Sequence, residues 1–296
     1  MRDRENVARA AAPAGCGACG MLWGMLICQL SDLHVRRPGA LAYGRVDTES
    51  YVRRCVAEIA VRTPRPDAIV ITGDVVDRGS EEEYAHARAL LAPLAMPVYA
   101  IPGNHDDRAA LRRAFPDAVP TDDGADFLQY TASLGALRLI ALDTLLPGEG
   151  GGRLCAARLA WLEEALARAS PAPIVILMHH PPFATGIRYM DAVGLETAYP
   201  LEPIIRRHPN VERILCGHVH RTIVRRYGGT LAVTCPSPAH QVALDFAAGA
   251  PAAFVMEPPG YLLHRWSEDA GCTTYAAVLG DYDGPYRFYE PGARPS

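Results

Sequence analysis

The chain has 296 residues, of which 49% are hydrophobic and 21% charged, and its formal net charge is -4. This composition is typical of a globular protein with one large core, or one core and a small appended unit, and it excludes disorder over most of the chain. The slight acidic excess argues against binding along an extended nucleic acid, which requires a basic surface.

The N-terminal region contains three arginines ahead of an apolar run, an arrangement that resembles a secretion signal. The run Met21–Leu30 leads directly into Ser31-Asp32-Leu33-His34, so its removal would delete the segment that carries these polar residues. We interpret the run as the first β-strand and residues 1–20 as a disordered extension. The eight cysteines lack the spacing of a disulfide framework, which predicts a reducing, cytoplasmic location.

Apolar runs of strand length alternate with helical segments through most of the chain, the pattern of βαβ units. The predicted strands are Leu26–Leu30, Ala68–Thr72, Val98–Ile101, Leu137–Leu142, Ile174–Met178 and Arg213–Cys216. The predicted helices are Val46–Val61, Glu81–Leu91, Asp107–Phe115, Ala156–Ala169 and Leu201–Arg207. Short β-like stretches follow at 222–227, 231–234, 261–266 and 273–278, which predict a second layer of strands or a small cap. No apolar run approaches the roughly 20 residues that span a bilayer, so no membrane partner is expected.

Five short polar clusters each follow an apolar run, at the C-terminal end of a predicted strand. They are Asp32 with His34, Asp74, Asn104 with His105, His179, and His218 with His220. Ligands bind at that edge of open α/β sheets, so we expect the clusters to converge. Carboxylate, imidazole and amide oxygen are the ligands that transition metals use, and two such ions about 3.5–4 Å apart can clamp a phosphoryl group. The sequence therefore predicts a two-metal site for phosphate-ester hydrolysis.

Each cluster alone has an ordinary structural explanation. A single buried histidine is more often a core residue than a ligand, and Asp32 or Asp74 alone could be the N-cap of a helix. The pairs Gly73-Asp74 and Gly103-Asn104 could be simple turns. The metal site is indicated by the five clusters together, in this order and each behind a strand.

The motifs together resemble the complete signature of the calcineurin-like metallophosphoesterases, from about Met25 to His220. They are Asp32-x-His34, Gly73-Asp74-x-x-Asp77, Gly103-Asn104-His105-Asp106, His179 and Gly217-His218-x-His220. The resemblance implies an α/β fold, a four-layer αββα sandwich with two mixed sheets, and a binuclear site for two divalent ions of Mn, Fe, Zn or Co. It implies that Asp32, His34 and His220 hold one ion, that Asn104, His179 and His218 hold the other, and that Asp74 bridges both.

The resemblance also implies a division of the chain and a substrate class. We expect a catalytic domain over 21–235 and a β-rich cap or oligomerisation segment over 236–296, with a homo-oligomer as the assembly. Leu41-Ala-Tyr-Gly-Arg45, Gly103–Arg108 and Met178–Phe183 resemble the class III cyclic-nucleotide phosphodiesterases and bacterial glycerophosphodiesterases. The implied substrate is a small phosphodiester, either a cyclic nucleotide such as cAMP or a glycerophosphodiester.

Other polar residues near the motifs are candidates for direct roles in the reaction. His105 is not needed as a ligand, so we expect it to face the phosphate and donate a proton or stabilise developing charge. Asp77 is a candidate to orient His105. Substrate contacts are expected from Asn104, His105, Arg78 and His240. Asp77 and Arg78 could equally face solvent, and His240 could be an ordinary loop residue. His180 is expected to be structural, because it points away from its neighbour His179 in an extended segment.

Three other functions remain open from the sequence. Gly73–Gly79 also resembles the motif of serine/threonine protein phosphatases, so a phosphomonoesterase or protein phosphatase is the first alternative. A non-catalytic scaffold of the same fold is the second, although no expected ligand is missing. A nuclease is the third, and the absence of a basic groove disfavours it.

Overall fold

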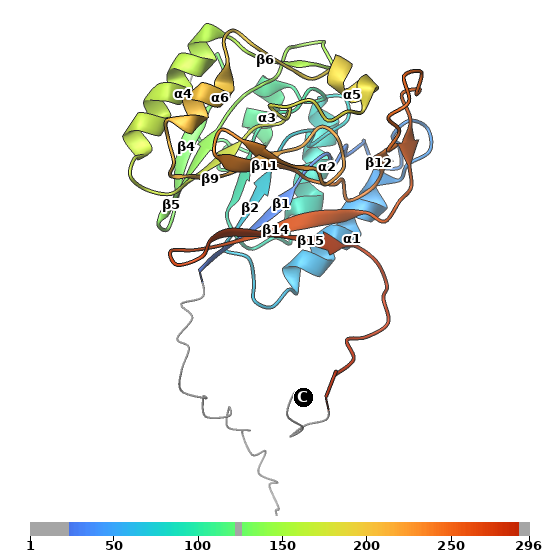
Figure 1. The fold of residues 1–296 in the computed structure, drawn as a ribbon. Helices are drawn as coiled ribbons and strands as arrows, with labels where there is room; N and C mark the ends of the chain where they lie inside the picture. The colour runs from blue at the N-terminus through green and yellow to red at the C-terminus, as the bar shows by residue number, and fades with distance from the viewer. Residues whose placement is uncertain (1–23, 122–125, 290–296) are drawn as a thin grey trace, which may run out of the picture.

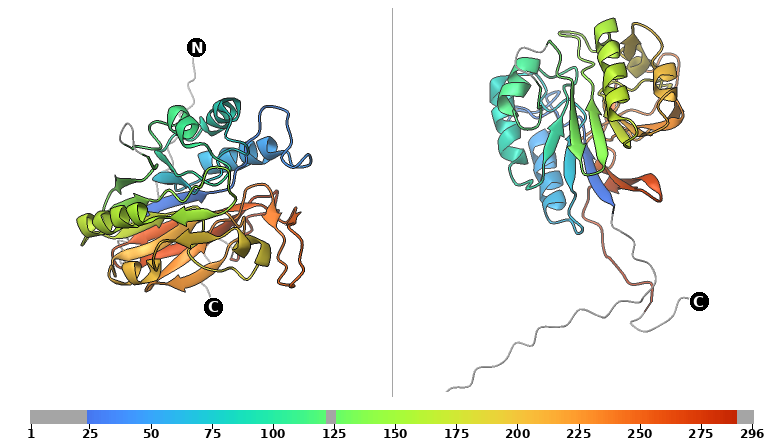
Figure 2. Two further views of the ribbon diagram at one scale, coloured as in Figure 1. Left: turned by 90° about the horizontal axis from the view of Figure 1, so that it is seen from above. Right: turned by 90° about the vertical axis from the view of Figure 1, so that its left-hand side faces the viewer.

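The computed structural model describes residues 24–121 and 126–289, which form two β-sheets packed face to face with helices on both outer faces (Figures 1 and 2). The first sheet has the strand order β15-β14-β1-β2-β3, and the second has the order β10-β11-β9-β7-β5-β4. Both sheets contain parallel and antiparallel pairs. The predicted four-layer αββα sandwich with two mixed sheets is therefore confirmed.

The first half of the chain builds three parallel strands and the helices on one outer face. Its elements are β1 (Met25–Leu30), α1 (Thr48–Ala60), β2 (Ala68–Ile71), α2 (Glu81–Leu91), β3 (Val98–Ala100) and α3 (Arg108–Ala114). All four residues of β2 are buried, as expected of a parallel strand covered on both faces. Each helix has an N-cap residue whose side chain accepts a hydrogen bond from a backbone N–H of the first turn. The N-caps are Asp47 for α1, Ser80 for α2 and Asp107 for α3. These caps fix where the loop after each strand ends.

The second half of the chain builds the other sheet. Its elements are β4 (Tyr130–Leu134), β5 (Leu137–Ala141), β6 (Gly152–Leu154), α4 (Ala156–Ala169), β7 (Ile174–Leu177), α5 (Arg188–Ala192), β8 (Leu195–Thr197), α6 (Leu201–Arg206), β9 (Val211–Cys216), β10 (Val224–Tyr227) and β11 (Thr230–Thr234). Four of these elements, β4, β6, α5 and β8, were not predicted from the sequence. The last three of these have three to five residues, too few for a periodic pattern to stand out.

The C-terminal cap is not confirmed. The strands β14 (Gly260–Ser267) and β15 (Gly271–Val278) complete the first sheet, where β14 pairs antiparallel with β1. The short ribbon of β12 (Gln241–Val242) and β13 (Phe254–Val255) forms a two-stranded sheet of its own, as β6 and β8 do earlier in the chain. Pairing with β14 removes the open edge that β1 would otherwise present. The domain division at residue 235 stays a prediction, and the first sheet draws strands from both sides of it.

A polar network crosses the otherwise apolar interior near the predicted site. Gln29 donates from Nε2 to Thr72 Oγ1 and to the Cys216 carbonyl, both at 2.9 Å, and its Oε1 accepts from His264 Nε2 at 2.9 Å. The Thr274 hydroxyl lies 3.0 Å from His264 Nδ1. The network ties β14 to β1, β2 and β9, and every polar atom named here has a partner. No helix of residues 24–121 and 126–289 combines the length and apolarity needed for a bilayer crossing.

Changing His264→Gln should make the protein more resistant to acid. Burial lowers the pKa of His264 to about 3, so its neutral form is stabilised in the folded state. The unfolded chain, with a histidine pKa near 6.5, then binds more protons between the two values, and stability falls as the pH drops through this window. Between pH 7 and pH 5 the wild type should lose about 1–2 kcal/mol through this group. Urea unfolding at both pH values should show a correspondingly smaller loss in the variant, and equal losses would contradict the expectation.

Candidate metal centre

The predicted ligands lie in loops at the carboxyl ends of the strands, where the two sheets meet. Asp32 and His34 follow β1, Asp74 follows β2, Asn104 follows β3, His179 follows β7, and His218 and His220 follow β9. All except Asn104 are buried. The parallel strands therefore bring these segments to one edge, as the sequence predicted.

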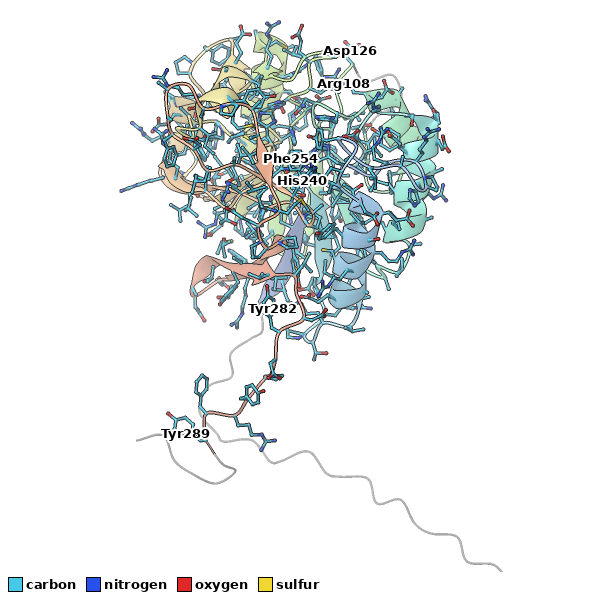
Figure 3. All side chains as sticks on the ribbon, turned by 90° about the vertical axis from the view of Figure 1, so that its right-hand side faces the viewer. Arg108, Asp126, His240, Phe254, Tyr282 and Tyr289 are labelled. Atoms are coloured by element: carbon cyan, nitrogen blue, oxygen red, sulfur yellow. The ribbon has the colours of Figure 1, made fainter. Side chains whose placement is uncertain are left out.

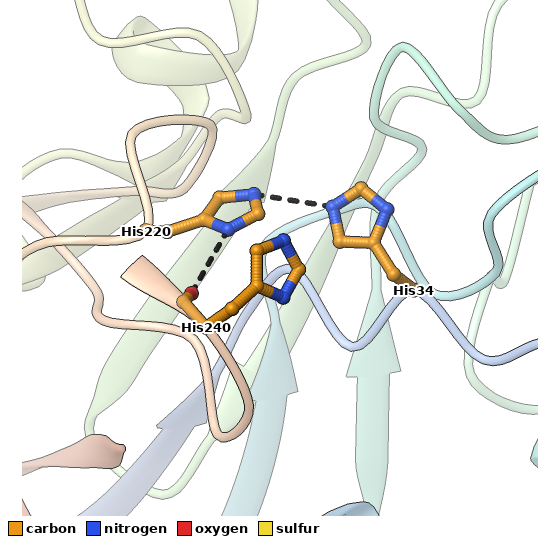
Figure 4. Close-up of side chains that lie close together, drawn as sticks. All are labelled: His34, His220 and His240. Carbon is orange, nitrogen blue, oxygen red and sulfur yellow. Dashed lines mark hydrogen bonds between the residues drawn. The ribbon is translucent and has the colours of Figure 1, made fainter. Parts of the chain in front are cut away.

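The first group of ligands surrounds one position beside β1. Asp32 Oδ1 lies 3.5 Å from His220 Nε2, and His34 Nε2 lies 3.1 Å from His220 Nε2. Asp74 Oδ2 lies 3.5 Å from His34 Nε2. Figure 4 shows the rings of His34 and His220 with their nitrogens facing each other. Asp32, His34, Asp74 and His220 together form a cluster of ligand atoms that could hold a metal ion.

The second group lies on the other side of Asp74. Asn104 Oδ1 lies 3.0 Å from His179 Nε2 and 3.1 Å from His218 Nδ1. The same Asp74 Oδ2 that approaches His34 also lies 3.4 Å from His179 Nε2. One carboxylate oxygen thus stands between the two groups of ligands, where a bridging ligand is needed.

The outer nitrogens of three of the four predicted ligand histidines are anchored by backbone oxygens. The carbonyls that accept these hydrogen bonds are Thr72 for His179 Nδ1 at 2.8 Å, Val193 for His218 Nε2 at 2.9 Å and His240 for His220 Nδ1 at 3.2 Å (Figure 4). A neutral imidazole that donates from one nitrogen carries a lone pair on the other. In the neutral form of each of these histidines, the inner nitrogen therefore presents its lone pair toward the carboxylate and amide oxygens.

This arrangement fits a pair of divalent cations. Lone pairs on nitrogen and oxygen face each other at 3.0–3.5 Å, which is unfavourable unless a proton or a cation lies between them. Asp32 Oδ2 is buried and has no hydrogen-bond partner, and a buried carboxylate oxygen normally has one. Anchored outer nitrogens are also the usual arrangement around metal-binding histidines.

The pKa values show that neighbouring ligands hold protons very differently in the protein alone. Burial alone would lower the pKa of His179, but the Asp74 carboxylate outweighs it and raises the pKa to about 9. Burial, with the neighbouring His179, lowers the pKa of His218 to about 3. Burial raises the pKa of Asp32 to about 6. A cation at Asp74 would replace the proton on His179, because a ligating imidazole must be neutral.

Backbone strain is concentrated at the ligands. Six non-glycine residues among those described have a positive φ, and five of them are predicted ligands: Asp32 at 54°, His34 at 45°, Asp74 at 50°, His218 at 73° and His220 at 48°. The left-handed region costs a side-chain-bearing residue about 1–2 kcal/mol. Such strain persists where the surrounding structure holds a functional geometry. The sixth residue is Tyr43, at 51°.

Two glycines allow the ligand loops to approach closely. A Cβ on Gly73, whose φ is +94°, would lie 2.4 Å from His179 Nδ1, and one on Gly103 would lie 2.2 Å from Asp74 Oδ1. Side chains cannot be accommodated at these distances. The glycines in the Gly-Asp and Gly-Asn pairs are therefore required by packing between loops, and not only by turn geometry.

His105 lies beside the ligands but outside both groups. Its backbone N–H donates to Asp74 Oδ1 at 2.9 Å, and its Nδ1 lies 2.8 Å from the Asp77 carbonyl oxygen. The side chain is 31% exposed and lines the cavity above the ligands. With Nδ1 engaged by the carbonyl, Nε2 is the nitrogen left free for a substrate.

The other predicted contacts of this region are distributed differently from the sequence hypothesis. The Asp77 carboxylate lies nearer to His34 Nδ1, at 3.3 Å, than to His105 Nδ1, at 3.8 Å. Its other oxygen lies 3.1 Å from Arg36 Nη1. It is therefore the carbonyl of Asp77 that positions His105, while its carboxylate faces a predicted ligand. Arg78 is 75% exposed and does not line the cavity.

His180 and His240 occupy contrasting environments. His180 Nδ1 lies 2.8 Å from the Thr144 hydroxyl and Nε2 lies 3.2 Å from the Gly150 carbonyl oxygen, so both nitrogens are engaged, consistent with its expected structural role. The His240 ring stands beside His34 and His220 (Figure 4), lines the cavity, and its buried Nδ1 has no partner.

Asp106, for which no role was predicted from the sequence, connects the ligand loops. Its carboxylate accepts hydrogen bonds from the backbone N–H groups of Val75, Val76 and Gly103 and from the Tyr84 hydroxyl, at 2.9–3.3 Å. These bonds tie the loop after β2 to the loop after β3. The signal was present, since Asp106 belongs to the quoted Gly-Asn-His-Asp motif, but sequence spacing does not show which backbone groups a carboxylate will reach.

Comparisons with known proteins agree with this geometry. The sequence profile of the family described as calcineurin-like phosphoesterase matches residues 25–222. A probable glycerophosphodiester phosphodiesterase of Arcobacter nitrofigilis is 36% identical over 90% of this chain and 97% of its own length. A 3',5'-cyclic adenosine monophosphate phosphodiesterase of Pseudomonas aeruginosa is 32% identical over 87% of this chain and 91% of its own length. In fold, the chain resembles a dimetal phosphatase from Danio rerio, with a TM-score of 0.62 at 15% identity over 86% of this chain and 99% of that one.

Proposed function

Because this chain belongs to the calcineurin-like phosphoesterase family, we propose that it is a metal-dependent phosphodiesterase that cleaves small phosphodiesters. One observation carries the proposal: Asp74 Oδ2 lies within 3.5 Å of both His34 Nε2 and His179 Nε2, so one carboxylate can serve two ions. The curated relatives named above are phosphodiesterases, which favours a diester over a monoester.

We propose that Asp32, His34 and His220 hold one ion, that Asn104, His179 and His218 hold the other, and that Asp74 bridges them. When bound, divalent ions supply Lewis acidity that lowers the pKa of water and offsets the charge on phosphoryl oxygens. Mn, Fe, Zn and Co all suit this mixture of oxygen and nitrogen ligands, so the pair present in the cell stays a prediction.

The protein's own contribution is to hold the substrate and move a proton. His105, fixed through its Nδ1 by the Asp77 carbonyl, presents Nε2 to the cavity, where the imidazolium form can donate to the departing alkoxide. The amide of Asn104 and the ring of His240 border the same cavity and can hold the phosphate and its substituents. Arg78, which is exposed and outside the cavity lining, is not part of the proposed contact set.

The monoesterase alternative is tested by comparing two aryl phosphates. We expect bis(p-nitrophenyl) phosphate to be hydrolysed with at least about tenfold higher kcat/KM than p-nitrophenyl phosphate, because the cavity is lined by no arginine or lysine that would compensate the second charge of a monoester. The measurement is initial rates on the full chain loaded with manganese or zinc. A preference for the monoester would favour the phosphatase alternative instead.

Metal analysis of the same preparation separates the enzyme from a scaffold. About two ions per chain are expected, and fewer than one after loading would favour the non-catalytic alternative. A homo-oligomeric state and a cytoplasmic location remain proposals. The second is supported by six free cysteines among the described residues, four of them buried, since unpaired thiols are typical of reducing compartments.

A further inference from the structure

The cavity over the metal centre has an aromatic wall. Tyr43, His240 and Phe254 stand in mutual contact, with ring centroids 5.3 Å apart for each pair. Figure 3 shows His240 and Phe254 side by side on segments of the C-terminal third of the chain. The three residues come from the turn after β1, the loop before β12 and the strand β13, and all three line the cavity.

A further part of the lining is also apolar. Tyr189, Met190 and Val193, from α5 and the residue after it, line the same cavity. Tyr43 is 53% exposed and Tyr189 is 48% exposed, so neither ring is fully covered by the protein. The cavity volume of about 380 Å³ falls within the range of small-molecule sites.

The backbone holds Tyr43 in a strained conformation. Its φ of 51° makes it the sixth non-glycine residue with a positive φ, beside five predicted metal ligands. The turn is closed by reciprocal hydrogen bonds between Ala42 and Val46, both at 2.9 Å. Such strain in a bulky residue points to a held functional geometry, and Tyr43 is not one of the predicted metal ligands.

The charge of the lining restricts what can occupy this wall. Neither lysine nor arginine lines the cavity, and the only carboxylate in its lining is Asp74. A substituent with its own negative charge would gain no partner there. A neutral planar ring would gain apolar burial and stacking on the aromatic faces.

We propose that Tyr43, Phe254 and Tyr189 form a ring-binding subsite, which takes a neutral aromatic ring carried on the alcohol that is esterified to the phosphate, such as the base of a nucleoside phosphodiester. This inference rests on the proposed function, because it places the phosphate at the metal centre and the ring on the adjacent wall. It deepens that function by favouring nucleotide diesters over diesters of small aliphatic alcohols.

Two ligands that differ only by a base test the subsite directly. Calorimetric titration of the manganese-loaded full chain with adenosine 5'-monophosphate and with ribose 5-phosphate measures the affinity ratio. Stacking of one base on aromatic side chains predicts a ratio of about 10- to 100-fold in favour of the nucleotide. A ratio below about twofold would overturn the proposal.

Matched variants test whether the aromatic wall causes the affinity ratio between the two ligands. Phe254→Ala should reduce it at least about fivefold, whereas Phe246→Ala should leave it unchanged, because Phe246 is 62% exposed and does not line the cavity. Equal effects of the two variants would contradict the subsite. If Phe254→Ala does not fold, Tyr189→Ala, from α5, serves the same purpose. The ratio is measured without turnover, so a protein that discriminates the two ligands but cleaves no diester would refute the proposed function and not the subsite.

Discussion

Changing Asp74→Ala should reduce diester hydrolysis by at least about 10³-fold. Asp74 Oδ2 approaches both groups of ligands, at 3.5 Å from His34 Nε2 and 3.4 Å from His179 Nε2. One substitution thus removes a ligand from both ions. Bound ions lower the activation barrier by several kcal/mol, and each loss of about 1.4 kcal/mol slows the reaction tenfold. Initial rates on bis(p-nitrophenyl) phosphate measure the loss.

Metal content and a control substitution accompany that measurement. The Asp74→Ala protein should bind fewer ions than the wild type at the same loading. Asp117→Ala, at an exposed position beyond α3, should retain wild-type rates and metal content. An Asp74→Ala variant that keeps two ions and more than a tenth of the activity would show that this carboxylate does not bridge.

Changing His105→Ala should slow turnover by about 10²–10⁴-fold while both ions stay bound. His105 donates no ligand atom to either group, and its ring lines the cavity, so its loss removes proton transfer or charge stabilisation and leaves the metals in place. The measurement pairs kcat on a diester with metal content after gel filtration.

His208→Ala provides the matched control, since His208 lies in the turn between α6 and β9, away from the described ligands. It should behave as the wild type in both assays. The assignment of His105 would be wrong if its alanine variant released metal, or if its rate on an alkyl phosphodiester, whose leaving group needs a proton, stayed within a few fold of the wild type.

The strands that carry the site were predictable because their sequence pattern is strong. Buried parallel strands such as β2 are apolar along their whole length, and a polar ligand directly after each one marks the edge where the site lies. The convergence of Asp32, Asp74, Asn104, His179 and the two later histidines was therefore expected from the order of the motifs, and the distances agree with it.

The placement of β14 and β15 could not be predicted in the same way. Their apolar pattern indicated strands, but pairing between β14 and β1 joins residues such as Leu263 and Cys28, which are far apart in the sequence. Local pattern carries no information about such a partner. The same reason explains why the contact of the Asp77 carboxylate with His34 was missed. The motifs predict that Asp77 and His105 lie near the same site, but not the direction in which the Asp77 side chain points.

The strand β1 is paired with β2 on one side and with β14 on the other, which has a consequence for how a nascent chain acquires its structure. During synthesis β1 leaves the ribosome early, yet its second neighbour follows only after more than two hundred further residues have been added. Because synthesis adds roughly 5–20 residues per second, one edge of β1 stays unpaired for about ten seconds or more. A chaperone that binds unpaired strand edges could bind β1 during that interval.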